Sequence, residues 1–268
     1  MSDYIKIKKF LKRLLFVPHC AGCGARLSPI AREDNLSHGT VCLCQKCMQN
    51  WQTAKREACH VCFMPAGECT CTGINRKIKQ PFIPSLFFYH QNRSSVQNQV
   101  LFSAKTRHDP ELFEFLAKEL VSSIEKLMAE KGLSLDDCIL TWLPRNKRSI
   151  RKHGHDQAQL LCLELSKLLN VSAMQLLTRR GGTEQKKLDA KERRENAEAS
   201  TFLNVRLRGI KHPSDMGIRD IVQDKTIILI DDIITTGASM RRGILLLEPL
   251  KPRAILCACV ARREIKSK

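Results

Sequence analysis

The sequence has few aromatic residues, an acid deficit and no long apolar run. Aromatic residues make up 5% of the 268 residues, which argues against a surface built on extensive stacking with nucleobases. No stretch approaches the ~20 consecutive apolar residues that span a bilayer. Residues 1–16 alternate lysines with apolar residues and lack the pattern of a cleavable secretory signal. We therefore expect a cytoplasmic protein without a membrane span.

The excess of basic residues indicates an anionic partner. The chain has 45 Lys and Arg against 27 Asp and Glu, which gives a formal net charge of +18. A charge of this sign and size suits nucleic acid, a phosphorylated metabolite or both. Net charge alone does not distinguish between these partners.

Cysteine is abundant and unevenly distributed. Of the 13 cysteines, four close pairs precede residue 72. Paired cysteines in a reducing compartment indicate metal binding rather than disulfides. Two residues between two cysteines let both sulfurs reach one ion, and four thiolates complete a structural zinc site. The sequence therefore predicts structural Zn²⁺ near the N-terminus.

The assignment of these cysteines to ions is open. The simplest division gives two sets of ligands: Cys20, Cys23, Cys44 and Cys47, then Cys59, Cys62, Cys69 and Cys71. The second set is less regular, because a single residue separates its last two cysteines. Possible substitute ligands are Cys42, His19, His38 and His60. Residues 72–80 have the composition of a linker, so we expect an N-terminal helix and zinc module in residues 1–80 and a second domain in residues 81–268.

The second domain shows an alternating pattern of strands and helices. Apolar runs predict strands at 85–89, 138–143, 225–230 and 254–260, and helical periodicity predicts helices at 110–130, 157–169 and 237–250. Such alternation is typical of a parallel sheet with helices on both faces. In these sheets the ligands bind beyond the carboxyl ends of the strands.

One segment, residues 227–239, carries a specific ligand signal. A buried strand leads into Asp231 and Asp232, which suit the hydroxyls of a sugar diol. A turn that opens a helix follows, and its backbone N–H groups and hydroxyls form an anion site. The turn residues are Thr235, Thr236, Gly237, Ala238 and Ser239. Phosphate donors beside diol acceptors predict a ribose 5-phosphate group as ligand, with the two aspartates as the candidate catalytic residues.

This order of strand, acids and turn resembles the phosphoribosyl-pyrophosphate motif of type I phosphoribosyltransferases. With a cysteine-rich module in front, nearly the whole chain resembles the ComF family, including its GntX-type members. The resemblance implies a type I phosphoribosyltransferase sheet and Mg²⁺ bound together with phosphoribosyl pyrophosphate. It also implies a pyrophosphate-facing loop at residues 143–157, with Arg145 and further charge from Arg148 and Arg151. Within a mobile hood at residues 178–200, it implies a catalytic role for Arg193.

Two functions follow from these features. The first is a ComF-like accessory protein of DNA uptake in natural transformation, which binds single-stranded DNA and works with an uptake helicase or processing protein. Its candidate DNA contacts are Lys6, Lys8, Lys9, Lys12, Arg13, Arg76, Lys77 and Lys79. The alternative is a metabolic phosphoribosyltransferase with an unidentified base or amine as acceptor. Catalysis itself stays open, because function resides in the site rather than the fold.

Overall fold

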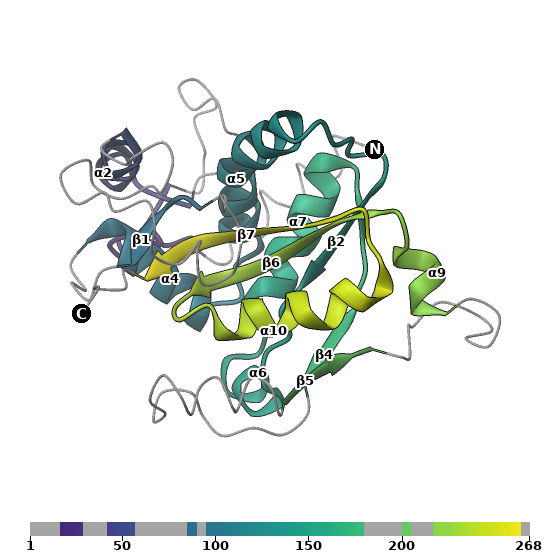
Figure 1. The fold of residues 1–268 in the computed structure, drawn as a ribbon. Coiled ribbons are helices and arrows are strands. Elements are labelled where there is room, and N and C mark those ends of the chain that lie inside the picture. The colour runs from purple at the N-terminus through teal and green to yellow at the C-terminus, as the bar shows by residue number, and fades with distance from the viewer. Residues whose placement is uncertain are drawn as a thin grey trace, which may run out of the picture.

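The computed structural model describes residues 17–28, 42–56, 85–89, 95–179, 200–204 and 217–263. Its centre is a parallel sheet with the strand order β1-β7-β6-β2-β3 (Figure 1). The strands are β1 (Phe87–Tyr89), β2 (Cys138–Trp142), β3 (Ser172–Ala173), β6 (Thr226–Ile234) and β7 (Ala254–Arg263). Because all pairs are parallel, the carboxyl ends of β2, β6 and β7 lie at one edge of the sheet.

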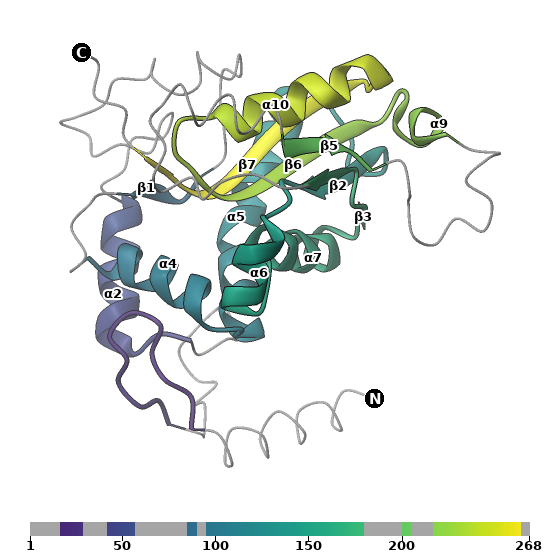
Figure 2. The same cartoon turned by 90° about the horizontal axis from the view of Figure 1, so that it is seen from below.

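The central strand β6 buries both of its faces, which explains its unbroken apolar sequence. Ile227 and Leu229 belong to one hydrophobic cluster, which α9 (Ile218–Val222) and α10 (Ala238–Leu247) complete. Ile228 and Ile230 belong to a second cluster on the other face, with α5 (Pro110–Glu130) and α7 (Gln157–Leu169). Figure 2 shows these helices on the two sides of the sheet. The predicted fold class, a parallel sheet covered on both faces, is confirmed.

Local capping signals set where the helices begin. Asp109 accepts hydrogen bonds from two N–H groups of the first turn of α5, and Pro110 follows as the first helical residue. Asp156 caps α7, and Asn146 caps the short helix α6 (Lys147–His153). Within the described ranges, no helix is long and apolar enough to cross a membrane.

The described part of the cysteine-rich segment packs against the α5 face of the sheet domain. Helix α2 (Gln45–Arg56) buries Trp51 completely. The Trp51 indole donates a hydrogen bond to Glu119 Oε2 at 2.8 Å, and its ring centroid lies 5.3 Å from that of Phe115. In α4 (Val96–Thr106), the Ser103 hydroxyl donates to the carbonyl of Ala21 at 2.8 Å. The described part of the cysteine-rich segment and the sheet domain therefore share one hydrophobic core. The expected boundary near residue 80 lies outside the described residues.

Several elements differ from the sequence-based expectation. Strand β6 continues to Ile234, so the two aspartates lie within the strand and not after it. The helix expected at 237–250 is α10 followed by a 3₁₀ turn at Glu248–Leu250. The features that were not predicted are helices α2, α4, α6 and α9, strand β3, and the antiparallel pair formed by β4 (Leu177–Arg179) and β5 (Thr201–Leu203).

Candidate functional site

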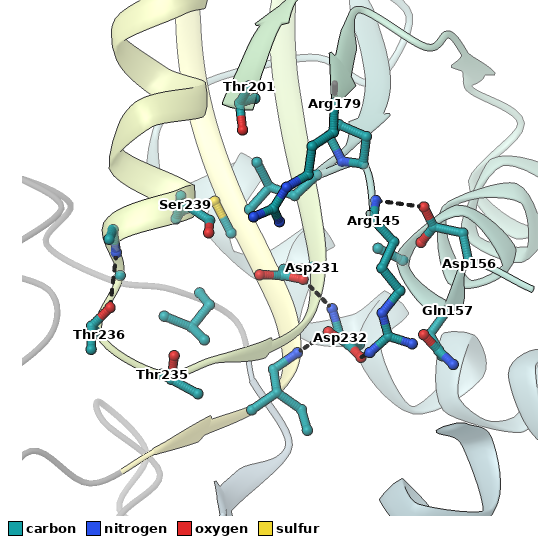
Figure 3. A pocket seen from close by; sticks show the side chains of 18 residues that line it. Arg145, Asp156, Gln157, Arg179, Thr201, Asp231, Asp232, Thr235, Thr236 and Ser239 are labelled. Atoms are coloured by element: carbon teal, nitrogen blue, oxygen red, sulfur yellow. Dashed lines mark hydrogen bonds and ion pairs between the residues drawn. The ribbon is translucent and has the colours of Figure 1, made fainter. Parts of the chain in front are cut away.

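A cavity of about 130 Å³ lies at the carboxyl edge of the sheet. Its walls come from the loop between β2 and α6, from β4 and β5, and from the end of β6 with the turn into α10 (Figure 3). We call this space the ligand cavity. It lies where ligands bind in open parallel sheets, beyond the strand ends.

Asp231 and Asp232, the acid pair, form one wall of the ligand cavity. The N–H of Asp232 donates to Asp231 Oδ1 at 2.8 Å, and the N–H of Ile233 donates to Asp232 Oδ1 at the same distance. Burial and the charge of Asp232 raise the pKa of Asp231 well above its ordinary value. The fold therefore holds a carboxyl in a place where its charged form is unfavourable without a partner.

The turn of residues 235–239, the phosphate turn, lines the same cavity as the acid pair and opens α10. Gly237 has φ of 75°, in the left-handed region that favours glycine. The N–H of Ala238 donates to Thr236 Oγ1 at 3.4 Å. The amino end of a ten-residue helix thus borders the cavity, and its dipole and N–H groups favour an anion there.

Two arginines add positive charge to the ligand cavity. Arg145 Nη2 lies 3.4 Å from Asp232 Oδ2, and the backbone N–H of Arg145 donates to Asp156 Oδ2 at 2.9 Å. Arg179 enters from β4. Burial lowers its pKa below the ordinary value, and the charge of Asp231 opposes part of this decrease. Among the described residues, Arg145 Nη1 and Arg179 Nε are buried without a hydrogen-bond partner. Buried donors of this kind indicate an anionic ligand, because leaving them unpaired costs about 1–3 kcal/mol each.

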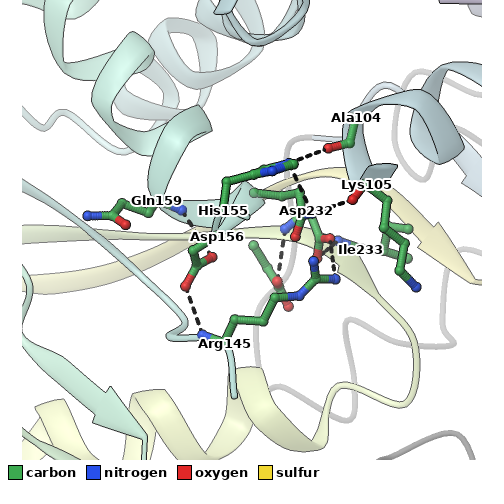
Figure 4. A network of polar contacts seen from close by, with 10 residues as sticks. Ala104, Lys105, Arg145, His155, Asp156, Gln159, Asp232 and Ile233 are labelled. Atoms are coloured by element: carbon green, nitrogen blue, oxygen red, sulfur yellow. Dashed lines mark hydrogen bonds and ion pairs between the residues drawn. The ribbon is translucent and has the colours of Figure 1, made fainter. Parts of the chain in front are cut away.

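A polar network joins the cavity wall to α4 (Figure 4). His155 is 5% exposed, and its two ring nitrogens lie 2.8 Å from the carbonyl oxygens of His153 and Ala104. The Gln157 side-chain amide donates to the carbonyl of Lys105 at 3.1 Å. His155 also makes an edge contact with the Phe113 ring, with centroids 5.8 Å apart. These contacts fix the start of α7 and, through Asp156, the position of the Arg145 backbone.

The structure brings most of the predicted ligand residues together. The residues of the acid pair, the phosphate turn and Arg145 all line the ligand cavity. Arg148 lines a neighbouring groove, and Arg151 lines neither space. Arg193 and the candidate DNA contacts of the N-terminal 80 residues lie outside the described residues. Sequence reasoning missed Arg179, because a single arginine in a three-residue strand gives no local signal.

The sulfurs of Cys20, Cys23, Cys44 and Cys47 form a cluster, all within 4.8 Å of one another. Cys23 Sγ lies 3.8 Å from Cys44 Sγ, and a tetrahedral ion with Zn–S bonds of about 2.3 Å requires sulfurs about 3.8 Å apart. Burial alone would raise the pKa of Cys20. Hydrogen bonds from the N–H groups of Cys44, Cys23 and Gly22 outweigh this effect, so the pKa is lowered to about 7. The cluster has the donor set and spacing of a structural zinc site.

Two possible substitute ligands lie outside this cluster. Cys42 is buried, its carbonyl accepts from the N–H of Ala21 at 2.8 Å, and burial raises the pKa of its thiol. His19 forms an isolated bridge with Arg26. The second expected set lies outside the described residues, as do His38 and His60; the second set comprises Cys59, Cys62, Cys69 and Cys71.

The family model of the phosphoribosyl transferase domain matches residues 187–268, which include the acid pair and the phosphate turn. No curated protein matches the chain. The family match and the covered parallel sheet agree on a phosphoribosyltransferase-like fold.

Similar solved structures include a hypoxanthine phosphoribosyltransferase from Staphylococcus aureus, with 12% identity over 60% of this chain and 70% of that chain and a TM-score of 0.33. Another is the hypoxanthine phosphoribosyl transferase of Trypanosoma cruzi, with 13% identity, coverage of 59% and 71%, and a TM-score of 0.35. The purine phosphoribosyltransferase of Pyrococcus horikoshii has 12% identity, coverage of 55% and 83%, and a TM-score of 0.30. Scores this low carry no argument about the site.

Proposed function

We propose that the ligand cavity binds phosphoribosyl pyrophosphate together with Mg²⁺. The observation that carries this proposal is the presence of the acid pair and the phosphate turn in the lining of one cavity. The turn suits the 5-phosphate, and the two carboxylates suit the ribose hydroxyls. Arg145 extends from the loop between β2 and α6 toward the acid pair, where it would meet the diphosphate.

The same arrangement supports a transfer reaction. An acceptor nucleophile attacks the anomeric carbon, the bond from that carbon to the diphosphate oxygen breaks, and the diphosphate leaves with the electron pair. Asp231 and Asp232 stabilise the positive charge that develops on the ribosyl ring, and Arg145 and Arg179 stabilise the departing negative charge. The oxygens of the acid pair are the hard donors that Mg²⁺ prefers, and the ion would neutralise charge on the diphosphate.

Calorimetry with phosphoribosyl pyrophosphate and Mg²⁺ tests the proposed ligand. Binding should be lost in the double variant Asp231→Asn, Asp232→Asn. The matched control is Asp224→Asn. Asp224 is exposed and lies at the opposite end of β6, and asparagine tolerates the left-handed backbone conformation of this residue. Lost binding in the double variant and retained binding in the control support the proposal. A folded wild-type protein that does not bind phosphoribosyl pyrophosphate overturns it.

We infer that Zn²⁺ occupies the cysteine cluster as a structural ion and that the second cysteine set holds another. Metal analysis of the variants Cys44→Ser and Cys62→Ser tests each assignment separately. Each variant should contain about one ion fewer than the wild-type protein. An unchanged zinc content in Cys44→Ser would contradict the assignment of the first site.

We propose that the chain is a ComF-like accessory protein of DNA uptake. It would act in the cytoplasm and bind single-stranded DNA and an uptake helicase or processing protein. The net charge of +18 supports it. Affinity for a single strand should fall steeply with salt, because phosphate contacts release counterions. The alternative, a metabolic phosphoribosyltransferase, predicts diphosphate release with a base or amine acceptor. Salt-insensitive or absent DNA binding would favour this alternative.

A further inference from the structure

A second and much larger space adjoins the ligand cavity. Its volume is about 1070 Å³, and it shares Arg145, Arg179 and Ile233 with the smaller cavity. Its walls come from α4, from α6, and from the cysteine loop at residues 21–24. We call it the basic groove. Because the two spaces meet at both arginines, a ligand in the groove reaches the ligand cavity at the side chains with unpaired buried donors.

The charged side chains in the lining of the groove are of one sign. Besides the two shared arginines, its basic side chains are Lys105, Arg107, Arg148 and Lys152. No aspartate or glutamate belongs to the lining among the residues that the structure describes. A concave surface with charges of one sign concentrates the field and attracts ligands of the opposite sign. A neutral base alone would leave these charges without counterparts.

The groove also presents an exposed aromatic ring. Phe102 of α4 is 68% exposed, the largest exposed fraction among the exposed large apolar side chains of the described residues. Its neighbours in the lining, one turn earlier, are the side chains of Asn98 and Gln99. An aromatic ring beside cations offers a stacking surface for a planar base next to contacts for phosphate.

We propose that the basic groove binds a second ligand that carries both phosphate and a planar base, which is the chemistry of a nucleotide. Arg148 and Lys152 contact the phosphate, Phe102 stacks with the base, and Arg145 and Arg179 form the passage to the ligand cavity. This chemistry is shared by a free nucleotide and by a single-stranded nucleic acid. The inference rests on the proposed function only for the role of the neighbouring cavity.

Helix α6 offers a matched pair of variants. The variant Arg148→Glu, Lys152→Glu reverses two charges that line the groove. The variant Lys147→Glu, Arg151→Glu reverses two charges with the same spacing on the same helix, and neither residue lines the groove. All four side chains are exposed. Both variants change the net charge equally, so a difference between them reports the groove and not the overall charge.

The probes are thymidine 5′-monophosphate and a short oligothymidylate, titrated by calorimetry and fluorescence anisotropy. The Arg148→Glu, Lys152→Glu variant should lose about tenfold or more in affinity for the probe that binds, because two charge-assisted contacts are lost. The Lys147→Glu, Arg151→Glu variant should stay within about twofold. Phe102→Ala should weaken the same probe without changing the charge. Binding of the monophosphate identifies a free-nucleotide site, and binding of the oligonucleotide alone identifies a strand site.

Two outcomes would overturn the inference. One is a wild-type protein that binds phosphoribosyl pyrophosphate but neither probe; the proposed ligand of the cavity then stands without the groove, and the DNA-binding role falls with it. The other is an equal loss of affinity in the two α6 variants, which would assign the effect to net charge. Groove-dependent probe binding without phosphoribosyl pyrophosphate binding would uphold the nucleotide site and refute the proposed function. A thermal midpoint equal to that of the wild-type protein in both α6 variants checks that they fold.

Discussion

At the scale of single residues, Asp231 places a carboxyl inside a buried parallel strand. Burial and the neighbouring Asp232 raise its pKa, so its ionised form opposes folding. We predict that Asp231→Asn increases the free energy of unfolding at neutral pH by about 1 kcal/mol, while it weakens binding of phosphoribosyl pyrophosphate. The amide oxygen retains the hydrogen bond that Asp231 Oδ1 accepts from the N–H of Asp232. Denaturant unfolding beside calorimetry measures both effects.

The sign of the pH dependence separates this effect from a change in packing. A carboxyl with a raised pKa binds its proton more tightly in the folded state than in the unfolded state. The contribution of Asp231 to the free energy of unfolding therefore falls as pH rises from the unfolded pKa of about 3.9 through the raised folded pKa. The stability difference between Asp231→Asn and wild type should grow over that interval. A difference that does not change with pH would contradict the prediction.

Gly22 lies where no other residue fits. A Cβ atom there would be 2.9 Å from both Cys47 Sγ and Val96 Cγ2. We predict that Gly22→Ala displaces the Cys47 sulfur and weakens zinc binding, with a loss of stability of about 1–3 kcal/mol. The control is Gly132→Ala, where φ is 60° but no atom lies within 4 Å; it strains the backbone away from the metal. Zinc competition with a chelator should distinguish them, and equal zinc retention would refute the role of Gly22.

At the scale of elements, the packing of α10 on the sheet depends on Gly243. A Cβ atom at this position would lie 2.9 Å from Leu229 Cδ2 and 3.0 Å from Leu143 Cδ2. Alanine favours a helix over glycine by about 1 kcal/mol, yet overpacking a core costs about 1–3 kcal/mol. We predict that Gly243→Ala destabilises the fold and weakens phosphoribosyl pyrophosphate binding, because α10 carries the phosphate turn.

Denaturant unfolding and calorimetry on Gly243→Ala measure the two consequences. The matched substitution is Leu245→Ala on the same helix, because Leu245 is 47% exposed and its truncation leaves the helix–sheet contact intact. Leu245→Ala should change stability little and leave ligand affinity unchanged. Increased stability in Gly243→Ala would show that helix propensity outweighs the close contact.

Elements with a strong apolar pattern were predictable from the sequence. Helices α5 and α7 have the predicted bounds, because each is capped by an aspartate and buries a regular apolar face. Helix α4 was not predicted, because two of its buried side chains, Asn98 and Ser103, are polar and interrupt the pattern. The end of β6 was placed too early, because an acid pair is typical of the end of a buried strand.

In the candidate site, too, only residues with a local sequence pattern were predictable. The acid pair and the phosphate turn were predictable, because they lie in one continuous segment whose order carries the signal. Arg179 was not, because only the tertiary fold brings it to the same cavity as Asp231, which lies 52 residues later in the chain (231 − 179). The basic groove was equally invisible, since it assembles α4, α6 and the cysteine loop.

At the scale of the whole molecule, the cysteine cluster and the ligand cavity are connected through α4. Ser103 binds the carbonyl of Ala21 in the cysteine loop. At the end of the helix, the carbonyls of Ala104 and Lys105 contact His155 and Gln157, and Gln157 lines the ligand cavity. We therefore expect loss of the proposed Zn²⁺ to act on a shared core and not on a separate module.

We predict that zinc removal destabilises the whole molecule and exposes Trp51. The chain has two tryptophans, so Trp142→Phe makes Trp51, which is completely buried, the single reporter. A strong chelator with a reducing agent should shift its emission to longer wavelength. The thermal midpoint should fall by about 4 °C or more, which corresponds to a loss of at least about 1–2 kcal/mol in a chain of this size. Affinity for phosphoribosyl pyrophosphate should fall with it.

Re-addition of Zn²⁺ is the control, and it should restore the emission, the thermal midpoint and the affinity together. The three readouts should change together because Trp51 contacts α5 through Glu119 and Phe115, and α5 packs directly on α7, whose first residue borders the ligand cavity. If Trp51 became exposed while ligand affinity stayed constant, the cysteine segment would fold and unfold independently of the sheet. An unchanged emission after complete zinc removal would show that packing alone holds this segment in place.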